Sequence, residues 1–300
     1  REDAMYTSRP TIDHGRCTLC GRCVAICESR KLAIREKTLH VLDDCAVCGH
    51  CYAVCEAGAI SFETLRPRVF KSFPYDGAYF PPGTPDPATV AGLIGSRRSV
   101  RHYTAQEPSA DSIDDLLECA SMAPSAHNDQ QWEFAVVRDR ALIAELSGRL
   151  LEYYGGLNRL VGRAFMRRLA GIFMGKKVER YYREHYTGVE RRVEAAAAGK
   201  DLFFYGAPVL IIVHSAMDGN SPVENAQYAA YNICLLAHAM GLGTCFIGYA
   251  SYLLNMDRAW KKRLDIPAAH GVHAVLTLGY PAKEFLKPAP RKEYRARRLG

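Results

Sequence analysis

The feature that most constrains this chain is a cysteine pattern that occurs twice within the first 55 residues. Residues 17–27 read CTLCGRCVAIC, and residues 45–55 read CAVCGHCYAVC. Both runs have the spacing C-x2-C-x2-C-x3-C with glycine after the second cysteine, and they lie 28 residues apart. They hold eight of the eleven cysteines of the 300-residue chain. Chance does not account for such a repeat, so the two runs share a chemical role.

This spacing is the one with which bacterial proteins ligate cubane iron–sulfur clusters. Three thiolates on a short loop reach three corners of one cube, and the fourth cysteine points toward the other cluster. The pattern therefore predicts two [4Fe-4S] clusters. The predicted ligands of one are Cys17, Cys20, Cys23 and Cys55, and those of the other are Cys45, Cys48, Cys51 and Cys27.

Two other uses of cysteine compete with this interpretation. Disulfides suit small secreted chains, but residues 1–5 lack the apolar core of a secretory signal and the number of cysteines is odd. Zinc could bind the first two cysteines of each run, which would leave the third and fourth without a role. We expect reduced thiolates in a cytoplasmic protein, with Cys119, Cys234 and Cys245 in the apolar core.

On these motifs, residues 8–65 resemble the two-[4Fe-4S] ferredoxin family, and we expect a ferredoxin-like domain over residues 1–66. That family usually has proline after the fourth cysteine, where this chain has Glu28 and Glu56. We expect their negative charge to lower the cluster potentials. Residues 67–88 are rich in proline and aromatic side chains, which predicts an ordered, extended connector packed along the second domain.

From residue 89 onward the pattern changes to helices with separated strands. It predicts helices over 89–97 and 109–122, both amphipathic, and an apolar helix over 228–240. Strands are predicted over 133–138, 209–214 and 273–278, with a strand or loop over 243–248. This order favours the α+β class over a doubly wound parallel sheet. Neither G-x-G-x-x-G after a strand nor a P-loop motif occurs, so we expect no Rossmann dinucleotide site.

Four short strings in this region carry a second resemblance. They are SRRSVR at 96–101, APSAHNDQQW at 123–132, GLGTCFIG at 241–248 and LGYP at 278–281, followed by Arg291. Together they resemble the FMN-dependent nitroreductase family over residues 89–300, and the whole chain resembles the ferredoxin–nitroreductase fusions. The resemblance implies a mostly antiparallel sheet flanked by helices, bound FMN and a homodimer. Gln131 departs from the family pattern, which commonly has proline before the tryptophan.

The resemblance also implies roles for individual residues. Arg97 and Ser99 would contact the FMN phosphate, Arg98 lies in the same string, and Arg291 would close over the phosphate from the tail. Arg101 would lie near the N1/O2 edge of the flavin, and the backbone N–H of Gly248 would address N5. The residues expected to reach the flavin from the partner subunit are Pro124, Ser125 and Asn128. Taken alone, the arginines would equally suit a basic helix end.

A chain with these cofactors predicts an oxidoreductase. Iron–sulfur clusters move single electrons, and a flavin can accept them singly and deliver a pair. We expect electrons from ferredoxin or another one-electron donor, or NAD(P)H directly, to reach a small organic acceptor such as a nitro compound, quinone or activated alkene. No protein group is predicted to act as catalytic acid. The alternatives are an electron-transfer module that serves a partner protein and a degenerate binding scaffold.

The net charge of +7 is concentrated in residues 159–192 and in the tail. Without a nucleic-acid-binding motif, we interpret the basic residues as solvated helix faces and expect no nucleic-acid partner. No apolar run approaches the roughly 20 residues of a membrane span, and we expect no membrane association. Residues 153–200 lie where the family carries a variable excursion over the flavin. They are the predicted lid and substrate segment, with candidate contacts at Tyr153, Tyr154, Tyr181, Tyr182 and Tyr186.

Overall fold

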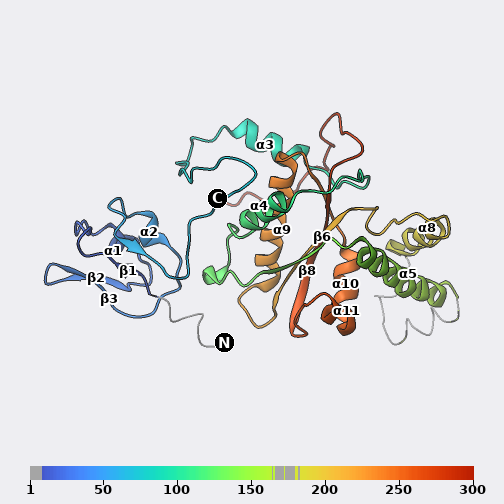
Figure 1. Cartoon of the computed structure of the whole chain (residues 1–300), viewed down its shortest axis with the longest axis horizontal. Coiled ribbons are helices and arrows are strands. Elements are labelled where there is room, and N and C mark those ends of the chain that lie inside the picture. The colour runs from blue at the N-terminus through green and yellow to red at the C-terminus, as the bar shows by residue number, and fades with distance from the viewer. Residues whose placement is uncertain (1–8, 164, 166–171, 173–179, 182) are drawn as a thin grey trace.

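The computed structural model describes residues 9–163, 165, 172, 180, 181 and 183–300. A cysteine-rich unit, residues 9–65, lies at one end of the molecule, and the α+β body lies at the other (Figure 1). No helix of the described part is both long and apolar enough to cross a membrane.

The cysteine-rich unit is built from two copies of one arrangement: strand, cysteine loop, short helix, strand. Its elements in chain order are β1 (Thr11–Ile12), α1 (Arg22–Ile26), β2 (Leu32–Arg35), β3 (Thr38–Val41), α2 (His50–Ala53) and β4 (Ile60–Ser61). β1 pairs with β4 and β2 pairs with β3, both antiparallel. The first strand of the unit therefore closes against its last strand. The buried side chains form one small cluster of Cys23, Leu32, Leu39, Cys51, Ile60 and Phe62.

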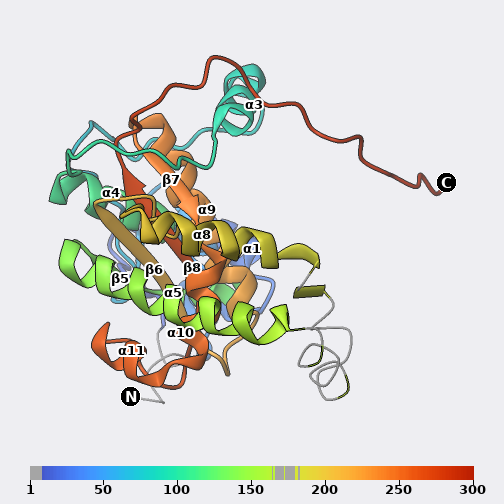
Figure 2. The ribbon, with the colours of Figure 1, turned by 90° about the vertical axis from the view of Figure 1, so that its right-hand side faces the viewer.

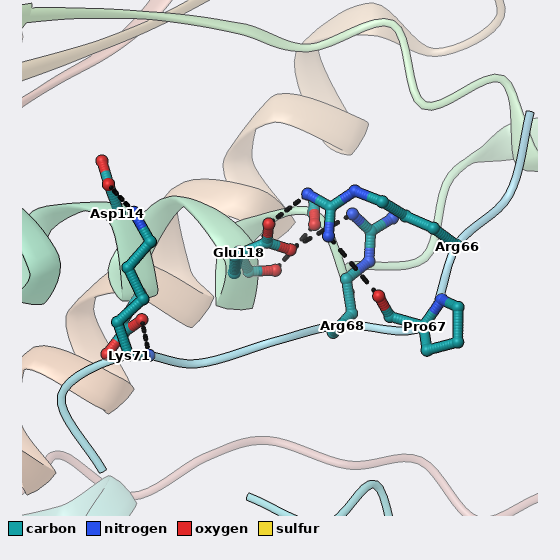
Figure 3. A network of polar contacts seen from close by, with 8 residues as sticks. Arg66, Pro67, Arg68, Lys71, Asp114 and Glu118 are labelled. Atoms are coloured by element: carbon teal, nitrogen blue, oxygen red, sulfur yellow. Dashed lines mark hydrogen bonds and ion pairs between the residues drawn. The ribbon is translucent and has the colours of Figure 1, made fainter. Parts of the chain in front are cut away.

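The connector between the two units has no helix or strand from residue 62 to residue 86. It is held on α4 (Ala110–Ala120) by ion pairs from Arg66 and Arg68 to Glu118 and from Lys71 to Asp114 (Figure 3). Next to these pairs, a fully buried carboxylate fixes the connector backbone from within.

That carboxylate belongs to Asp115 of α4. It accepts hydrogen bonds from the backbone N–H groups of Lys71 and Ser72, both at 2.7 Å, and from the Ser72 hydroxyl. Burial alone would raise the pKa of Asp115, but these hydrogen bonds and the charge of Lys71 lower it overall. The connector is thus attached by a charged anchor.

The α+β body is organised around one antiparallel sheet of four strands in the order β5-β6-β8-β7. The strands are β5 (Glu133–Val137), β6 (Val209–Ala216), β7 (Gly243–Phe246) and β8 (His270–Gly279). β6 and β8 are central and nearly fully buried because helices cover both faces of the sheet. A bulge between Val213 and His214 shifts the register of β6 against β8.

Alternate residues of β6 point to opposite faces and define two cores. Leu210 and Ile212 lie in the core under α5 (Arg140–Gly162), α8 (Tyr186–Ala197), α10 (Gly248–Met256) and α11 (Arg258–Arg263). Val209 and Ile211 lie in the core under α4 and α9 (Pro222–Ala239). Figures 1 and 2 show the sheet between these two helical layers, with α4 and α9 on the side of the cysteine-rich unit.

The predicted α+β class and the predicted strands are confirmed, with small shifts at their ends. α9 begins at Pro222, six residues before the predicted start of that helix. α3 (Pro87–Ser96) forms where predicted, but none of its residues is buried, and Val90 and Ile94 are both 46% exposed. The amphipathic helix predicted there is thus present, and Val90 and Ile94 are exposed on its surface in the single chain.

The predicted lid segment is described in part. α5 extends to Gly162 and α8 begins at Tyr186. Of the residues between them, 164, 166–171, 173–179 and 182 lie outside the described residues, and so does the candidate contact Tyr182.

Candidate functional site

The first cysteine loop and Cys55 surround a cavity of about 340 Å³. Its lining includes all four predicted ligands of one cluster, and the remaining lining residues also belong to the cysteine-rich unit. Cys23 is buried at its inner side, whereas Cys20 is exposed. The pairing of Cys55 with the first loop, across 32 residues of chain, is the arrangement that the spacing predicts for one of two interlocked clusters.

The backbone around both loops repeats the same unusual conformations. Gly21 and Gly49 have φ of 76° and 77°, a left-handed conformation in which glycine carries no steric penalty. Leu19 and Val47, two residues before them, are also left-handed, with φ of 55° and 49°. Equivalent positions of the two loops, 28 residues apart, thus adopt the same left-handed conformations, and each loop curves around its own cysteines.

Backbone N–H groups point at the cysteine sulfurs in the same repeated way. Lys31 N–H donates to Cys27 Sγ and Ala59 N–H donates to Cys55 Sγ, both at 3.3 Å and both from four residues later. Such donors stabilise the charge of a ligating thiolate. Burial raises the pKa of Cys51 to about 11, so that thiol must lose its proton when a metal centre binds.

The cysteines of the two loops do not form a preformed single-ion site in the described residues. Zinc holds thiolates at about 2.3 Å, which brings neighbouring sulfurs to roughly 4 Å from one another. Within the described residues, only Glu133, His214 and His270 place three potential ligand atoms within 4.8 Å of one another. No three of the eight repeat cysteines converge that closely. The cavity therefore offers four thiols that could ligate a metal centre.

In the α+β body, residues 97–101 run beside β7 as an extended segment. Ser99 bridges Thr244 in parallel, and Val100 N–H donates to the Thr244 carbonyl at 2.9 Å. Arg97, Ser99 and Arg101 all lie near Cys245, so alternate side chains of this string share one side. Burial raises the pKa of Cys245, against the opposing effect of these three residues.

This segment connects two cavities. One, of about 370 Å³, is lined by Arg97, Arg98, His238, Lys283 and Lys287, a set rich in cations. The other, of about 590 Å³, is lined by Arg101 and Gly248 together with aromatic side chains. A Cβ placed on Gly248 would meet no atom within 4 Å, so the backbone is open to the cavity at that point.

Two buried side-chain nitrogens of the described residues lack a hydrogen-bond partner: Arg97 Nε and Arg192 Nε. Each belongs to the lining of one of these two cavities. Leaving a buried charged donor unpaired costs free energy. An anionic group in the smaller cavity would supply the partner that Arg97 lacks, so the residues present fit a phosphate at this end.

The larger cavity has a mostly aromatic lining from several elements. Arg192 of α8 lies over the Tyr249 ring at 4.7 Å, and the Tyr154 hydroxyl donates to the Tyr249 carbonyl at 3.0 Å. Burial raises the pKa of Tyr154 and of Tyr181, so both hydroxyls stay neutral donors. Its lining residues of the predicted lid segment are Tyr154, Leu157, Leu160, Val161, Tyr181, His185 and Arg192.

The remaining predicted flavin contacts lie elsewhere in the chain. Asn128 lines a third cavity, of about 400 Å³, together with Cys48 of the cysteine-rich unit. Pro124 and Ser125 precede it in the same loop, which includes a 3₁₀ turn over Ala126–Asn128. Arg291 lies in the exposed tail after β8, which extends away from the body (Figure 2). One chain therefore brings Arg97, Arg98, Ser99, Arg101 and Gly248 together but not the other four.

Sequence reasoning missed several residues of this site. Cys245, predicted only as core, also lines the larger cavity, as do Tyr205, Phe246 and Tyr249. Cys245 and Phe246 belong to the string GLGTCFIG and lie on β7. Because side chains alternate between the two faces of a strand, this string could have indicated which of its residues face the cavity. Arg192 carried no signal because its basic neighbours indicate a solvated helix face.

A separate polar cluster lies at the opposite end of β8 from Gly279. The Nδ1 atoms of His214 and His270 lie 3.0 Å apart, within hydrogen-bond distance. The Lys261 ammonium donates a hydrogen bond to the His270 carbonyl at 2.6 Å. Burial, followed by the effect of His270, His273 and Lys261, lowers the pKa of His214 to about 4. The neighbouring ammonium disfavours a divalent cation here, and a neutral histidine pair accounts for the contact.

Comparison with known proteins places this geometry in a family context. The sequence model of the nitroreductase family matches residues 94–280. The chain is 28% identical, over 192 residues, to an Archaeoglobus fulgidus protein provisionally named NADH dehydrogenase/NAD(P)H nitroreductase; the match covers 64% of this chain and 85% of that protein. It is 27% identical to the 4-nitrobenzoate reductase of Nocardioides sp. (strain LMS-CY), over 63% of this chain and 78% of that protein. The crystal structure of a Bacteroides fragilis nitroreductase with bound FMN shares the fold, with a TM-score of 0.53 and 22% identity over 70% of this chain and 98% of that chain.

Proposed function

Because the chain belongs to the nitroreductase family, we propose that its α+β body is an FMN-dependent oxidoreductase that receives electrons through two [4Fe-4S] clusters in the cysteine-rich unit. The observation that carries the flavin assignment is the string from Arg97 to Arg101. It joins a cationic cavity, where Arg97 Nε is buried without a partner, to a larger aromatic cavity. Charge at one end and flat apolar walls at the other match a phosphorylated flavin.

The chain's own residues supply binding and orientation. Arg97 would hold the phosphate with Ser99, and Arg98 and the lysines of the tail add positive charge at the mouth. Arg101 would stabilise negative charge on the pyrimidine edge, and the backbone at Gly248 is open for close approach to N5. When bound, FMN supplies the chemistry that accepts single electrons and delivers a hydride pair.

The acceptor is proposed to be a small planar organic molecule. The larger cavity measures about 590 Å³, and rings from Tyr154, Tyr181, Phe203 and Tyr249 contribute to its walls. Aromatic walls favour stacking with a nitroaromatic, quinone or conjugated alkene and exclude water from the reacting edge. Arg192 adds a positive charge that would favour substituents whose oxygen atoms carry partial negative charge, such as a nitro group.

The active form is proposed to be a homodimer. Pro124, Ser125 and Asn128 lie apart from the arginine string within one chain, as expected if they serve the flavin of the partner subunit. The exposed apolar side of α3, with Val90 and Ile94, is a further surface that a second copy would cover. Arg291 follows the tail residues Lys283 and Lys287 that line the smaller cavity, and it would close over the phosphate from the tail.

The electron donor is proposed to be ferredoxin or a similar one-electron protein. The duplicated cysteine loops support this choice because clusters pass one electron at a time. Their interlocked geometry around a cavity, with N–H groups aimed at Sγ, supports two clusters rather than zinc. Direct reduction of the flavin by NAD(P)H would bypass this unit.

Anaerobic purification followed by iron, flavin and mass analysis tests the proposal. We expect about eight iron atoms and one FMN per chain, in a dimer. Arg97→Ala should weaken FMN binding by about 2 kcal/mol, roughly 30-fold, because a charge-assisted hydrogen bond is lost. Arg138→Ala, which removes an exposed arginine paired with Glu107, is the matched control and should retain FMN.

Two results would contradict the assignment. Zinc in place of iron would remove the electron relay, and undiminished FMN binding by the Arg97→Ala variant would remove the phosphate role. Reoxidation of the reduced protein by a nitroaromatic, quinone or conjugated alkene identifies an enzyme. Reoxidation by a partner protein alone would instead identify an electron-transfer module.

A further inference from the structure

The two proposed clusters differ in what surrounds them. The cavity among Cys17, Cys20, Cys23 and Cys55 is lined only by residues 17–60, so that site faces the rest of its own unit and solvent. The second cysteine loop, by contrast, contacts the α+β body. Cys48 and Tyr52 share a cavity of about 400 Å³ with Met122, Ala123 and Asn128.

A direct hydrogen bond joins the second loop to the body. The Asn128 side-chain amide donates to the Val47 carbonyl at 2.7 Å, and Val47 directly precedes the cluster ligand Cys48. Val47 N–H in turn donates to Cys45 Sγ at 3.4 Å. This polar contact between the two units thus ends at Val47, within two residues of the predicted ligands Cys45 and Cys48.

The loop that carries Asn128 is held in a strained conformation. His127, Asn128 and Gln130 all have positive φ, of 53°, 57° and 48°, and none of them is glycine. A left-handed conformation is unfavourable for residues other than glycine, so surrounding contacts must compensate. Ala126 N–H donates to the buried Asn225 side chain at 3.1 Å, and Gln130 N–H donates to Ser125 Oγ at 3.1 Å. These contacts, which outweigh the strain, hold Asn128 against the second cysteine loop.

The connector holds the same two surfaces together. Arg66 and Arg68 pair with Glu118, and Asp115 fixes the backbone at Lys71 and Ser72. These contacts begin directly after the cysteine-rich unit and leave little free chain between it and α4 (Figure 3). The second loop is therefore kept at the body rather than tethered loosely.

From these contacts, and on the basis of the proposed function, we infer that the cluster ligated by Cys27, Cys45, Cys48 and Cys51 is the one that passes electrons to a flavin. That flavin is the one which the loop of Asn128 is proposed to serve in the partner subunit, and Asn128 is the positioning residue of the junction. The cluster ligated by Cys17, Cys20, Cys23 and Cys55 is the outer one, which takes single electrons from the one-electron donor. Each oxidation of the donor by one electron delivers one electron to the flavin. Two such transfers supply the electron pair that reduces the acceptor.

The repeat offers a matched pair of variants, because Cys20 and Cys48 occupy equivalent positions and are both exposed. Cys20→Ser and Cys48→Ser should each lower the iron content while retaining FMN. The readout is the microwave-power saturation of the flavin EPR signal in partly reduced protein, which a nearby reduced cluster makes harder to saturate. We expect Cys20→Ser to retain this effect and Cys48→Ser to lose it by an order of magnitude or more.

A third variant tests the junction without removing a ligand. Asn128→Asp replaces the donating amide by a carboxylate that repels the Val47 carbonyl, so the effect on the flavin signal should weaken while the iron content stays unchanged. Because Asn128 is also proposed to lie at the partner subunit's flavin, the signal is compared per bound FMN, with the FMN content measured in the same sample. The inference is overturned if the flavin relaxation is lost in Cys20→Ser and retained in Cys48→Ser. It is also overturned if the two cysteine variants relax the flavin equally and Asn128→Asp relaxes it as the unaltered protein does. Absence of iron or FMN from the unaltered protein would instead contradict the proposed function itself.

Discussion

The cysteine-rich unit and the α+β body reach a stable fold by different means. The unit buries six apolar side chains in one cluster, two of them cysteines, and depends on left-handed turns at Gly21 and Gly49. The body carries an apolar core on each face of its sheet. Small domains bury too little surface to be stable alone and often add metal centres. The difference predicts that binding of the proposed clusters folds the first unit, whereas apolar burial folds the second.

Removing the iron gives the sharpest test of this difference. Anaerobic chelation should abolish protection of the amides of residues 9–65 from hydrogen exchange, because metal binding and folding are coupled in such units. The amides of β6 and β8 should stay protected, since those strands are buried between helices. Hydrogen exchange followed by mass spectrometry measures both regions in one sample. Protection that persists in the first unit after complete iron loss would show a self-sufficient fold.

The connector is the next point at which the comparison can fail. Asp115→Ala removes the buried carboxylate that accepts hydrogen bonds from two connector N–H groups, and it should destabilise the α+β body by about 4 kcal/mol, as measured by urea unfolding. Asp111→Ala is the matched control on the same helix. Asp111 is exposed and 3.9 Å from Lys71, so its loss should cost less than about 1 kcal/mol. Equal effects would mean that the connector does not contribute to the stability of the body.

Acid should affect the body through His214. Its pKa is lowered to about 4 from a usual 6.5, so unfolding takes up a proton between these pH values. The stability is therefore complete above pH 6.5 and falls, by up to about 3 kcal/mol, as the pH drops toward 4. The measurement is the urea concentration at the midpoint of unfolding, followed between pH 4 and pH 6.5. Its dependence on pH should become weaker in His214→Gln and stay unchanged in His102→Gln, at an exposed position. An unchanged slope in His214→Gln would assign the acid effect to other groups.

The smallest expected effect concerns the cluster potentials. Glu56 pairs with Arg22, and both side chains are largely exposed. Glu56→Gln should therefore cost less than 1 kcal/mol of stability, yet it leaves the Arg22 cation unpaired near the first loop. We expect a modest upward shift of one cluster potential in an anaerobic redox titration. A downward shift would reverse the sign predicted for Glu28 and Glu56.

The sequence predicted what depends on local spacing. The cysteine repeat placed both loops, and the strings from Ser96 and Gly241 marked two segments that lie side by side in the structure. It did not predict that Asn128 would contact Val47, because that contact depends on how the connector docks on α4. Arg192 was missed for a related reason, since only the packing of α8 over the sheet turns a basic helix residue into a cavity wall.

The pairing of β1 with β4 has a consequence for how such chains arise. Because the first and last strands of the cysteine-rich unit are neighbours, the polypeptide comes in and goes out at one corner. A domain whose two ends lie close together can be joined to another protein without a change in the fold of either one. A fusion by recombination would then require one new element, the connector, whose Arg66, Arg68 and Lys71 form ion pairs with α4. The fused chain would hold both units in contact from the start.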